Sequence, residues 1–334
     1  MTRILVLGGT GFVGRHIVHD LVGSGHEVCV FHRGEHEPAL AASVRHVHGV
    51  FRELREHLDE LRSFAPEVVV DTVPYHDKCG HGVLHFGGVA EWGVVITSGD
   101  VYRAFGRVWG SEPGRPDAVP LTEEAPLRER PSPDLGEEID FDNVEVERAV
   151  GRGEIPTTVL RSSAIFGPGD PFHRLYRYVK RMDDGRPTII LDARLAEWRW
   201  SRSYVQNVAH AVALAAVTRS TAGRTYNVAP ASTLSEKAWV TAIAAAHGWS
   251  GTIVAVPPDV LPEHLRVPFN TEQDVVLASS RIHEELAYDE PVRLPEALAR
   301  TIEWERAHPP PFSPAAFDYD AEDDVLARLG SDSG

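Results

Sequence analysis

The chain opens on a short apolar run that leads directly into a glycine-rich segment. Residues 3–7 read Arg-Ile-Leu-Val-Leu, typical of a buried parallel strand, and residues 8–14 read Gly-Gly-Thr-Gly-Phe-Val-Gly. Glycines at 23 and 25 end the next periodic segment before a second apolar run at 27–31. The apolar positions between these glycine clusters recur at helical spacing, at Ile17, Val18, Leu21 and Val22. The pattern predicts a strand, a loop, a helix and a second strand.

The spacing of glycines in this loop is typical of a dinucleotide-binding turn. One glycine allows the tight bend, one lets the backbone approach a pyrophosphate, and one lets the helix pack closely, with the helix N-terminus facing the phosphates. The flanking strand and helix favour this interpretation over a glycine-rich turn without a ligand. The predicted cofactor-binding residues here are Gly8, Thr10, Gly11, Phe12, Val13 and Gly14.

The end of the second strand bears on the choice of cofactor. An NAD site usually places an Asp or Glu there for the ribose hydroxyls, whereas this chain has His32 and Arg33. Arg33 can pair with a 2′-phosphate and Arg15 can support the phosphates, so the sequence favours NADP over NAD. The alternative for Arg33 is a solvated surface arginine.

Further motifs extend the pattern along the chain. Residues 67–73 predict another buried strand, and residues 94–102 predict a strand that runs into a polar turn. At this point the chain resembles the extended short-chain dehydrogenase/reductase family, the NAD(P)-dependent epimerases and dehydratases. Motifs that agree with this family in order lie at 160–170, 203–209, 226–228 and 279–282.

The resemblance implies an α/β fold, a Rossmann-type doubly wound parallel sheet with a smaller, mostly C-terminal substrate lobe. The expected Rossmann domain covers residues 1–166 and returns at about 200–228 and 294–308. The expected substrate lobe covers 167–199 and 229–293. Three prolines at 309–311 end the last predicted helix, and a Pro-rich then acidic tail follows over 309–334.

The chain departs from the family at its catalytic pair. The family carries out proton transfer with a Tyr-x-x-x-Lys pair and a serine, and the serine position here is Ser98. The Tyr and Lys positions fall on Ile139 and Asn143, or on Phe141 and Glu145 if the register moves by two. No register in this stretch places a tyrosine four residues before a lysine. Because isoleucine cannot transfer a proton and asparagine carries no cation, the chain is similar to atypical members that lack the dyad.

Several residues are candidates to replace the missing pair. Asp140 and Asp142 lie where the dyad belongs, and a desolvated carboxylate there could serve as an acid or base. The alternative is that aspartate simply caps a helix start. Tyr102 and Asp100, in the turn after Ser98, are further candidate proton donors.

Substrate contacts are expected from two segments. Tyr75 and His76 follow a strand whose loop lines the cofactor cleft in the family, and residues 198–204 place arginines beside aromatic rings. Such arginines suit a diphosphate with a base or sugar ring, and the alternative is a structural hairpin. The candidate residues in the second segment are Trp198, Arg199, Arg202 and Tyr204.

Four residues in one short segment are candidate metal ligands. His76, Cys79, His81 and His85 have a spacing that could bind zinc, but 17 histidines make chance clustering common and the family needs no metal, so no metal site is predicted. The four histidines at 32, 36, 46 and 48 are expected at the surface.

The composition of the chain limits which functional classes are plausible. The chain has 33 basic and 49 acidic residues, a net charge of −16, which disfavours binding to nucleic acid or anionic membranes. Two cysteines and no signal-like start predict a cytoplasmic location. The expected partner is a small molecule, and the sequence does not decide whether the chain forms a homodimer. The sequence therefore favours an NADP-dependent enzyme acting on a nucleotide sugar or secondary metabolite, the alternative being a non-catalytic NADP-binding or scaffold protein.

Overall fold

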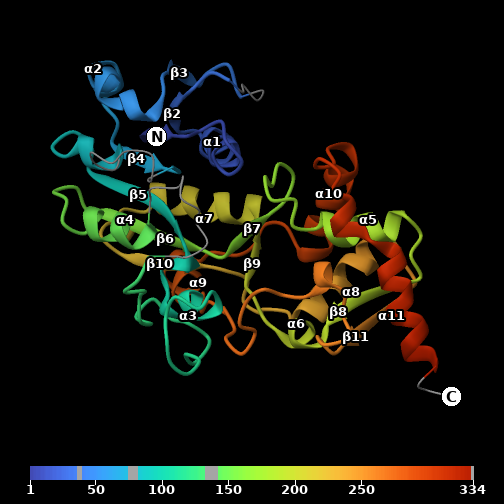
Figure 1. Ribbon diagram of the computed structural model, residues 1–334. Coiled ribbons are helices and arrows are strands. Elements are labelled where there is room, and N and C mark those ends of the chain that lie inside the picture. Colours follow the sequence, from blue (N-terminus) through green and yellow to red (C-terminus); the bar gives the residue numbers. More distant parts are fainter. Residues whose placement is uncertain (36–39, 74–81, 132–141, 332–334) are drawn as a thin grey trace.

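The computed structural model describes residues 1–35, 40–73, 82–131 and 142–331, which form two lobes. Figure 1 shows a sheet lobe on the left, containing the N-terminus, and a smaller lobe on the right, containing the C-terminal helices. None of the helices in the described ranges is long and apolar enough to cross a membrane.

The first lobe is built on a seven-stranded parallel sheet in the order β10-β6-β5-β4-β1-β2-β3. The order reverses between β1 and β4, so a crevice is expected at the carboxyl ends of these two strands. The strands are β1 (Arg3–Leu7), β2 (Glu27–His32), β3 (Arg45–His48), β4 (Val68–Asp71), β5 (Trp92–Ser98), β6 (Thr157–Ser162) and β10 (Thr225–Val228).

Alternating side chains of these strands pack against helices on both faces of the sheet. On one face Ile4 and Val6 join a core formed with α1 (Gly14–Gly23) and α7 (Val205–Val217). On the other face Leu5 and Leu7 pack with α2 (Leu58–Ser63) and α4 (Asn143–Val150). Because both faces are covered, the strands are continuously apolar, as the sequence predicted. The doubly wound α/β fold is confirmed.

The second lobe has its own small sheet and helical core. Strands β8 (Thr188–Asp192) and β11 (Thr252–Val256) pair in parallel. Its helices pack through buried side chains such as Tyr178, Trp239 and Ile302. The helices of this lobe are α5 (Tyr176–Asp183), α6 (Ala193–Glu197), α8 (Glu236–His247) and α10 (Leu294–Ala307).

Two short parallel strands connect the lobes. β7 (Ala164–Phe166) pairs with β9 (Arg202–Tyr204), so the chain leaves the first lobe and returns to it through adjacent strands. Another short helix, α3 (Arg103–Val108), begins soon after the end of β5.

Two predicted boundaries differ from the structure. Residues 294–308 were expected in the first lobe, but α10 packs on α5 and α8 because Ala297, Leu298 and Ile302 face them. Conversely, α9 (Ser280–Leu286) was expected in the substrate lobe and instead packs against β10, with Ile282 in the core of the first lobe. Both helices are amphipathic, and a single sequence does not say which core an apolar face joins.

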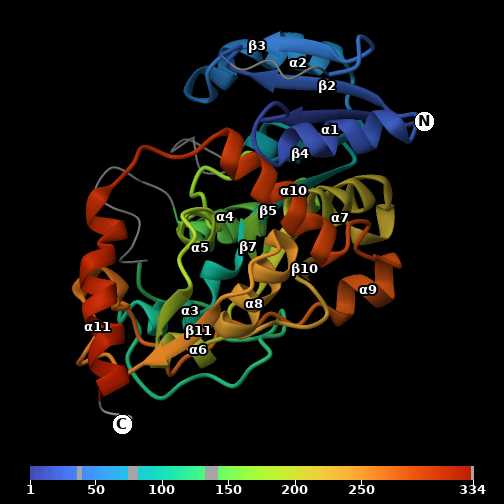
Figure 2. The same cartoon turned by 90° about the vertical axis from the view of Figure 1, so that its right-hand side faces the viewer.

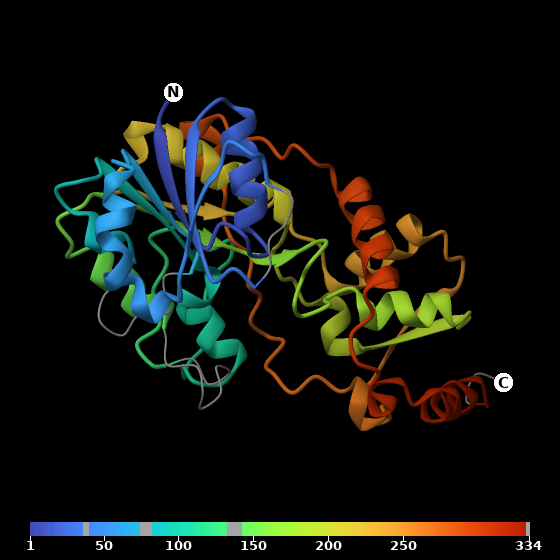
Figure 3. The same ribbon diagram turned by 90° about the horizontal axis from the view of Figure 1, so that it is seen from above.

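The acidic tail contains a further helix, α11 (Tyr319–Ser331), that the sequence reading did not predict. Figures 2 and 3 show it along the outer edge of the second lobe, far from β3. Its Glu322 is fully buried and pairs with the buried Arg181 of α5 at 2.6 Å. His264 also lies 3.1 Å from the Glu322 carboxylate, so the tail is docked on the lobe.

Candidate functional site

A cleft of about 760 Å³ opens at the carboxyl ends of β1 and β4, where the strand order reverses. All six predicted loop residues lie on its wall, together with Arg33. Among the described residues, those on the wall are Gly8, Thr10, Gly11, Phe12, Val13, Gly14, His32, Arg33, Glu35, Val50, Phe51, Arg52, Thr72, Val73, Pro171 and Phe172. This placement is the one that a dinucleotide requires in a doubly wound sheet.

The three spaced glycines meet different physical demands. Gly8 has a φ of +86°, and a Cβ there would collide with the Thr72 hydroxyl oxygen. A Cβ on Gly14 would collide with the Gly8 carbonyl oxygen, so only glycine lets α1 begin this close to β1. Gly11 has open space beside it, with the nearest atom 3.6 Å from an added Cβ. A bound pyrophosphate could approach the backbone there.

The N-terminus of α1 is suited to an anion. No side chain in the described ranges caps it, and its first turn carries no acidic residue. Its leading N–H groups and dipole therefore favour a negative group in the cleft.

The two predicted cofactor arginines behave differently. The Arg33 side chain is 59% exposed at the cleft wall and lies 3.3 Å from the Glu35 carboxylate. Because such a surface ion pair is weak, Arg33 can leave Glu35 and contact a ligand in the cleft. Arg15 donates to the Pro168 carbonyl and lies against Gly169, and is not among the residues that line the cleft. Arg15 thus ties the glycine loop to the segment after β7.

A second cavity of about 420 Å³ lies at the ends of β5 and β6 and contains Ser98. Asp100 also lines it, beside apolar and aromatic side chains such as Phe105, Trp109 and Trp200. Phe172, which is 74% exposed, borders both this cavity and the dinucleotide cleft. The serine predicted from the motif is therefore next to the cofactor cleft.

Asp100 is the most strongly perturbed acid in this cavity. Burial raises the pKa of its carboxyl to about 7, although Asn143 and Arg128 favour the ionised form. The Asn143 side chain donates to the carboxylate, with its nitrogen 3.0 and 2.9 Å from the two oxygens. Asn143, the first residue of α4, thus holds an acid of the turn that follows β5. An acid with a pKa near neutrality is suited to giving and taking protons.

Two of the other predicted acid–base candidates make structural contacts, and one falls outside the described residues. Asp142 caps α4, accepting from the Val144 amide at 2.8 Å, and forms a two-pronged pair with the buried Arg128. Tyr102 is fully buried, and its hydroxyl donates to Asn227 at 2.6 Å. Burial raises the pKa of Tyr102 above its ordinary value. Asp140 falls outside the described residues.

A third cavity of about 290 Å³ lies between the lobes. Arg202 and Tyr204, two of the predicted substrate residues, line it. The Arg202 guanidinium is 5.0 Å from the centre of the Trp239 ring and pairs with Glu236. Trp200 borders both this cavity and the one with Ser98, so the three openings follow one another through shared wall residues.

The remaining predicted substrate residues are not gathered in that cavity. Trp198 is 5% exposed in an aromatic core, and its indole donates to the Gln273 carbonyl at 2.6 Å. Arg199 pairs with Asp274 at 2.7 Å on the rim of a separate opening. Tyr75 and His76 lie outside the described residues. These contacts of Trp198 and Arg199 favour the alternative of a structural hairpin over substrate binding.

The histidines near the cleft are arranged differently from the expectation. His32 is only 3% exposed, so its predicted surface position is wrong. It packs with His46 and His48, and a nitrogen of each ring lies within 4.8 Å of the others. The sequence reading missed this group because His32 belongs to another strand, and strand pairing brings the three together. His36 lies outside the described residues, as do three of the four residues in the weighed zinc spacing.

Comparison with known proteins finds a family model that matches the N-terminal segment. Residues 4–93 match the model of the NAD dependent epimerase/dehydratase family, which confirms the resemblance over these residues. A UDP-glucose 4-epimerase of Neisseria meningitidis is 30% identical over 158 residues. That alignment covers 40% of this chain and 44% of the epimerase, so it spans less than half of the relative.

Solved structures resemble nearly the whole chain. The Thermus thermophilus UDP-glucose 4-epimerase complex with NAD has a TM-score of 0.64 at 22% identity, covering 92% of this chain and 99% of that one. The Bordetella bronchiseptica enzyme WbmG with NAD and UDP has a TM-score of 0.67 at 16% identity, with 92% and 96% covered. The Thermotoga maritima UDP-glucose 4-epimerase with UDP-glucose has a TM-score of 0.66 at 18% identity, with 91% and 99% covered. At these identities the likeness concerns the fold.

Proposed function

We propose that this chain, whose residues 4–93 match the model of the NAD dependent epimerase/dehydratase family, is a nicotinamide-dependent enzyme acting on a nucleotide sugar or a similar anionic small molecule. The observation that carries the proposal is the sharing of walls: Phe172 borders the dinucleotide cleft and the Ser98 cavity, and Trp200 borders that cavity and the one between the lobes. The cofactor, the reacting groups and the substrate would then lie next to one another in that order.

NADP is the proposed cofactor. Its pyrophosphate would lie over Gly11 and the start of α1, where backbone and dipole favour an anion. The end of β2 offers Arg33 and no carboxylate at the position where an NAD site usually has one. Among the wall residues that the structure describes, Glu35 is the acid, and it is paired with Arg33, so a 2′-phosphate would compete for that arginine.

The proposed chemistry uses Ser98 and Asp100. A bound nicotinamide supplies hydride transfer. Ser98 would donate a hydrogen bond to a substrate oxygen, and Asp100, with a pKa of about 7, would take or return the proton that accompanies the transfer. Asn143 would position Asp100, while Asp142 and Arg128 would hold the start of α4 that carries Asn143.

The substrate would extend from the Ser98 cavity toward the opening between the lobes. Arg202 lies there over the rings of Trp200 and Trp239, a pairing suited to a phosphate beside a planar group. WbmG and the Thermotoga maritima epimerase were solved with UDP and UDP-glucose. UDP-sugars are therefore the first substrates to test.

The test is a titration of the purified chain with NADPH and NADH, followed by nicotinamide fluorescence and thermal shift. We expect tighter binding of NADPH, and Arg33→Ala should weaken NADPH binding about tenfold while changing NADH binding less than about twofold. Arg45→Ala, an arginine of edge strand β3 that is not on the cleft wall, is the matched control. Binding of neither cofactor would refute the proposal, and equal losses for both would refute the role of Arg33.

A non-catalytic NADP-binding protein is the second candidate. It is favoured by the lack of a Tyr-x-x-x-Lys spacing in the stretch around residues 139–147 and by the engagement of both Asp100 oxygens with Asn143. Turnover of any UDP-sugar with bound cofactor, monitored by product analysis, would decide for the enzyme. Tight cofactor binding without any turnover or reduction of bound NADP across a UDP-sugar panel would decide for the binding protein.

A further inference from the structure

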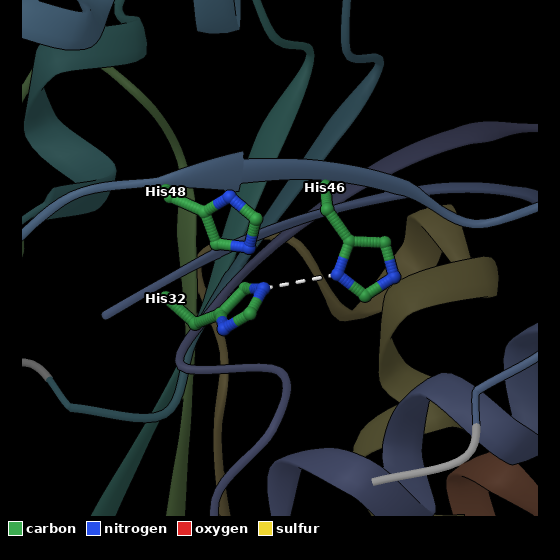
Figure 4. A group of neighbouring side chains, drawn as sticks. All are labelled: His32, His46 and His48. Atoms are coloured by element: carbon green, nitrogen blue, oxygen red, sulfur yellow. Dashed lines mark hydrogen bonds between the residues drawn. The ribbon is translucent and has the colours of Figure 1, made fainter. Parts of the chain in front are cut away.

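We propose that His32, His46 and His48 form a binding site for a divalent transition-metal ion at the edge of the dinucleotide cleft. Figure 4 shows the three imidazole rings turned toward one another, one from β2 and two from β3. One nitrogen from each ring lies within 4.8 Å of the other two. The proposal concerns this chain's own side chains and does not depend on the proposed enzymatic function.

The arrangement follows from the register of two parallel strands. His32 lies opposite His48, and His46 lies two residues earlier on β3. Because side chains two residues apart on a strand share a face, all three imidazoles project from the same side of the sheet edge. The ring centres of His32 and His48 are 4.7 Å apart, and those of His32 and His46 are 5.1 Å apart. Neither strand alone would bring the three imidazoles together.

The spacing is close to what a tetrahedral ion needs. Zinc–nitrogen bonds of about 2.0–2.1 Å place two ligand nitrogens roughly 3.3 Å apart in a tetrahedral site. His32 Nε2 and His46 Nδ1 are 2.9 Å apart, and the third nitrogen lies no farther than 4.8 Å from either. His48 is exposed, while His32 is buried. Closing the site therefore requires the nitrogens to approach by up to about 1.5 Å.

The donor set indicates the class of ion. Three neutral imidazoles suit zinc, copper, nickel or cobalt and do not suit magnesium or calcium, which prefer oxygen ligands. Three protein ligands leave a coordination position open, and His32 itself borders the cleft. A water molecule, or an anionic group of a molecule in the cleft, would complete the site.

Metal binding would change the tautomer of His32. In the metal-free chain the Gly34 amide donates to His32 Nδ1 at 3.2 Å, which leaves the ring proton on Nε2, facing His46 Nδ1 at 2.9 Å. A metal at Nε2 moves that proton to Nδ1, and the Gly34 N–H must then find another acceptor. Gly34 has a φ of +78° and is exposed, so its turn can readjust. The Gly34 amide is therefore a local reporter of loading.

The experiment titrates the full, tag-free, chelator-treated chain with Zn²⁺ by calorimetry and with Co²⁺ by visible absorption. We expect one tight ion per chain, a Co²⁺ spectrum of a four-coordinate site and a shift of the Gly34 amide resonance. His48→Gln and His46→Gln should each weaken Zn²⁺ binding by about tenfold or more. His308→Gln, at an exposed histidine that caps the C-terminal end of α10 in the second lobe, is the matched control and should bind like the unmodified chain.

Two results would overturn the proposal. One is the absence of stoichiometric Zn²⁺ binding by the unmodified chain. The other is equal affinity in the His46, His48 and His308 variants, which would assign the binding to other histidines. Because His48 is exposed, its glutamine variant should fold, and an unchanged thermal unfolding curve without metal verifies this.

Discussion

At the scale of single residues, Asp100 combines an unusual environment with a position beside Ser98. Its carboxyl is held by the Asn143 amide, and burial raises its pKa to about 7. The residue types alone did not identify this acid over Asp140 or Asp142. The distinction depends on burial and on a contact between residues 43 positions apart in the chain.

Replacing Asp100 by Asn tests its part in the proposed reaction. Asp100→Asn keeps the shape of the side chain but cannot take a proton, so turnover should fall by about 100-fold or more while NADPH affinity changes less than about twofold. The measurement is the steady-state rate against pH, which should also lose the ionisation near pH 7. Asp274→Asn, which alters only the partner of Arg199, is the control. Undiminished turnover would remove Asp100 from the mechanism.

The same substitution should change stability with a defined sign. Because the pKa rises from 3.8 to about 7 on folding, the folded state binds more protons between these values, and the group lowers stability progressively as pH rises through this range. The cost is absent below about pH 4 and complete above about pH 7. Asp100→Asn should therefore raise the free energy of unfolding by about 1–3 kcal/mol at pH 8 and have a much smaller effect at pH 4.

Urea unfolding at several pH values measures this difference. Comparing each variant with the unmodified chain at the same pH cancels the contribution of other acids such as Asp71, whose pKa burial also raises to about 7. A stability difference that does not depend on pH would contradict the assigned ionisation.

At the scale of elements, the start of α4 determines where Asn143 lies. Asp142 caps the helix and pairs with Arg128, whose side chain is fully buried. Asp142→Asn retains the oxygen that accepts from Val144 but leaves the Arg128 charge without its carboxylate. The free energy of unfolding should fall by about 3 kcal/mol.

A double variant separates the effect of the unpaired Arg128 charge on stability from the effect of the helix cap. Adding Arg128→Met to Asp142→Asn removes the unpaired cation, so the double variant should be more stable than the sum of the two single losses predicts. Thermal or urea unfolding of the four proteins measures this coupling. Additive losses would mean that the two side chains act independently.

Local patterns made the first elements predictable. The strand, glycine loop and helix at residues 3–23 depend on neighbours in sequence, and the structure places the loop on the cleft wall as predicted. The histidine site depends on the pairing of β2 with β3, and the environment of Asp100 depends on the packing of α4. Features of this second kind need long-range contacts, which hydrophobic periodicity in one sequence does not contain.

At the scale of the whole molecule, α11 completes the second lobe. Its Glu322 neutralises Arg181 in an interior where both side chains are almost fully covered. Glu322→Gln leaves a buried guanidinium without its partner, so the free energy of unfolding should fall by about 3–4 kcal/mol. Asp320→Asn, an exposed change on the same helix, should alter stability by less than about 0.5 kcal/mol.

Calorimetric unfolding of the two variants measures these changes in the free energy of unfolding. Separate probes of the lobes add information, because cofactor fluorescence reports on the sheet lobe and the Trp239 environment reports on the other. Equal stability of both variants would show that the Arg181 pair contributes little.

The pairing of β7 with β9 has a consequence for how such a chain can diversify. Residues 167–201 leave and re-enter the first lobe through adjacent strands, which lie roughly 5 Å apart. An inserted or rebuilt stretch between them changes neither end of the connection, so the seven-stranded sheet need not move. Pro171 and Phe172 line the dinucleotide cleft, so new specificity is expected to evolve in the later part of this segment, from α5 to α6, where changes leave the wall of the cleft intact.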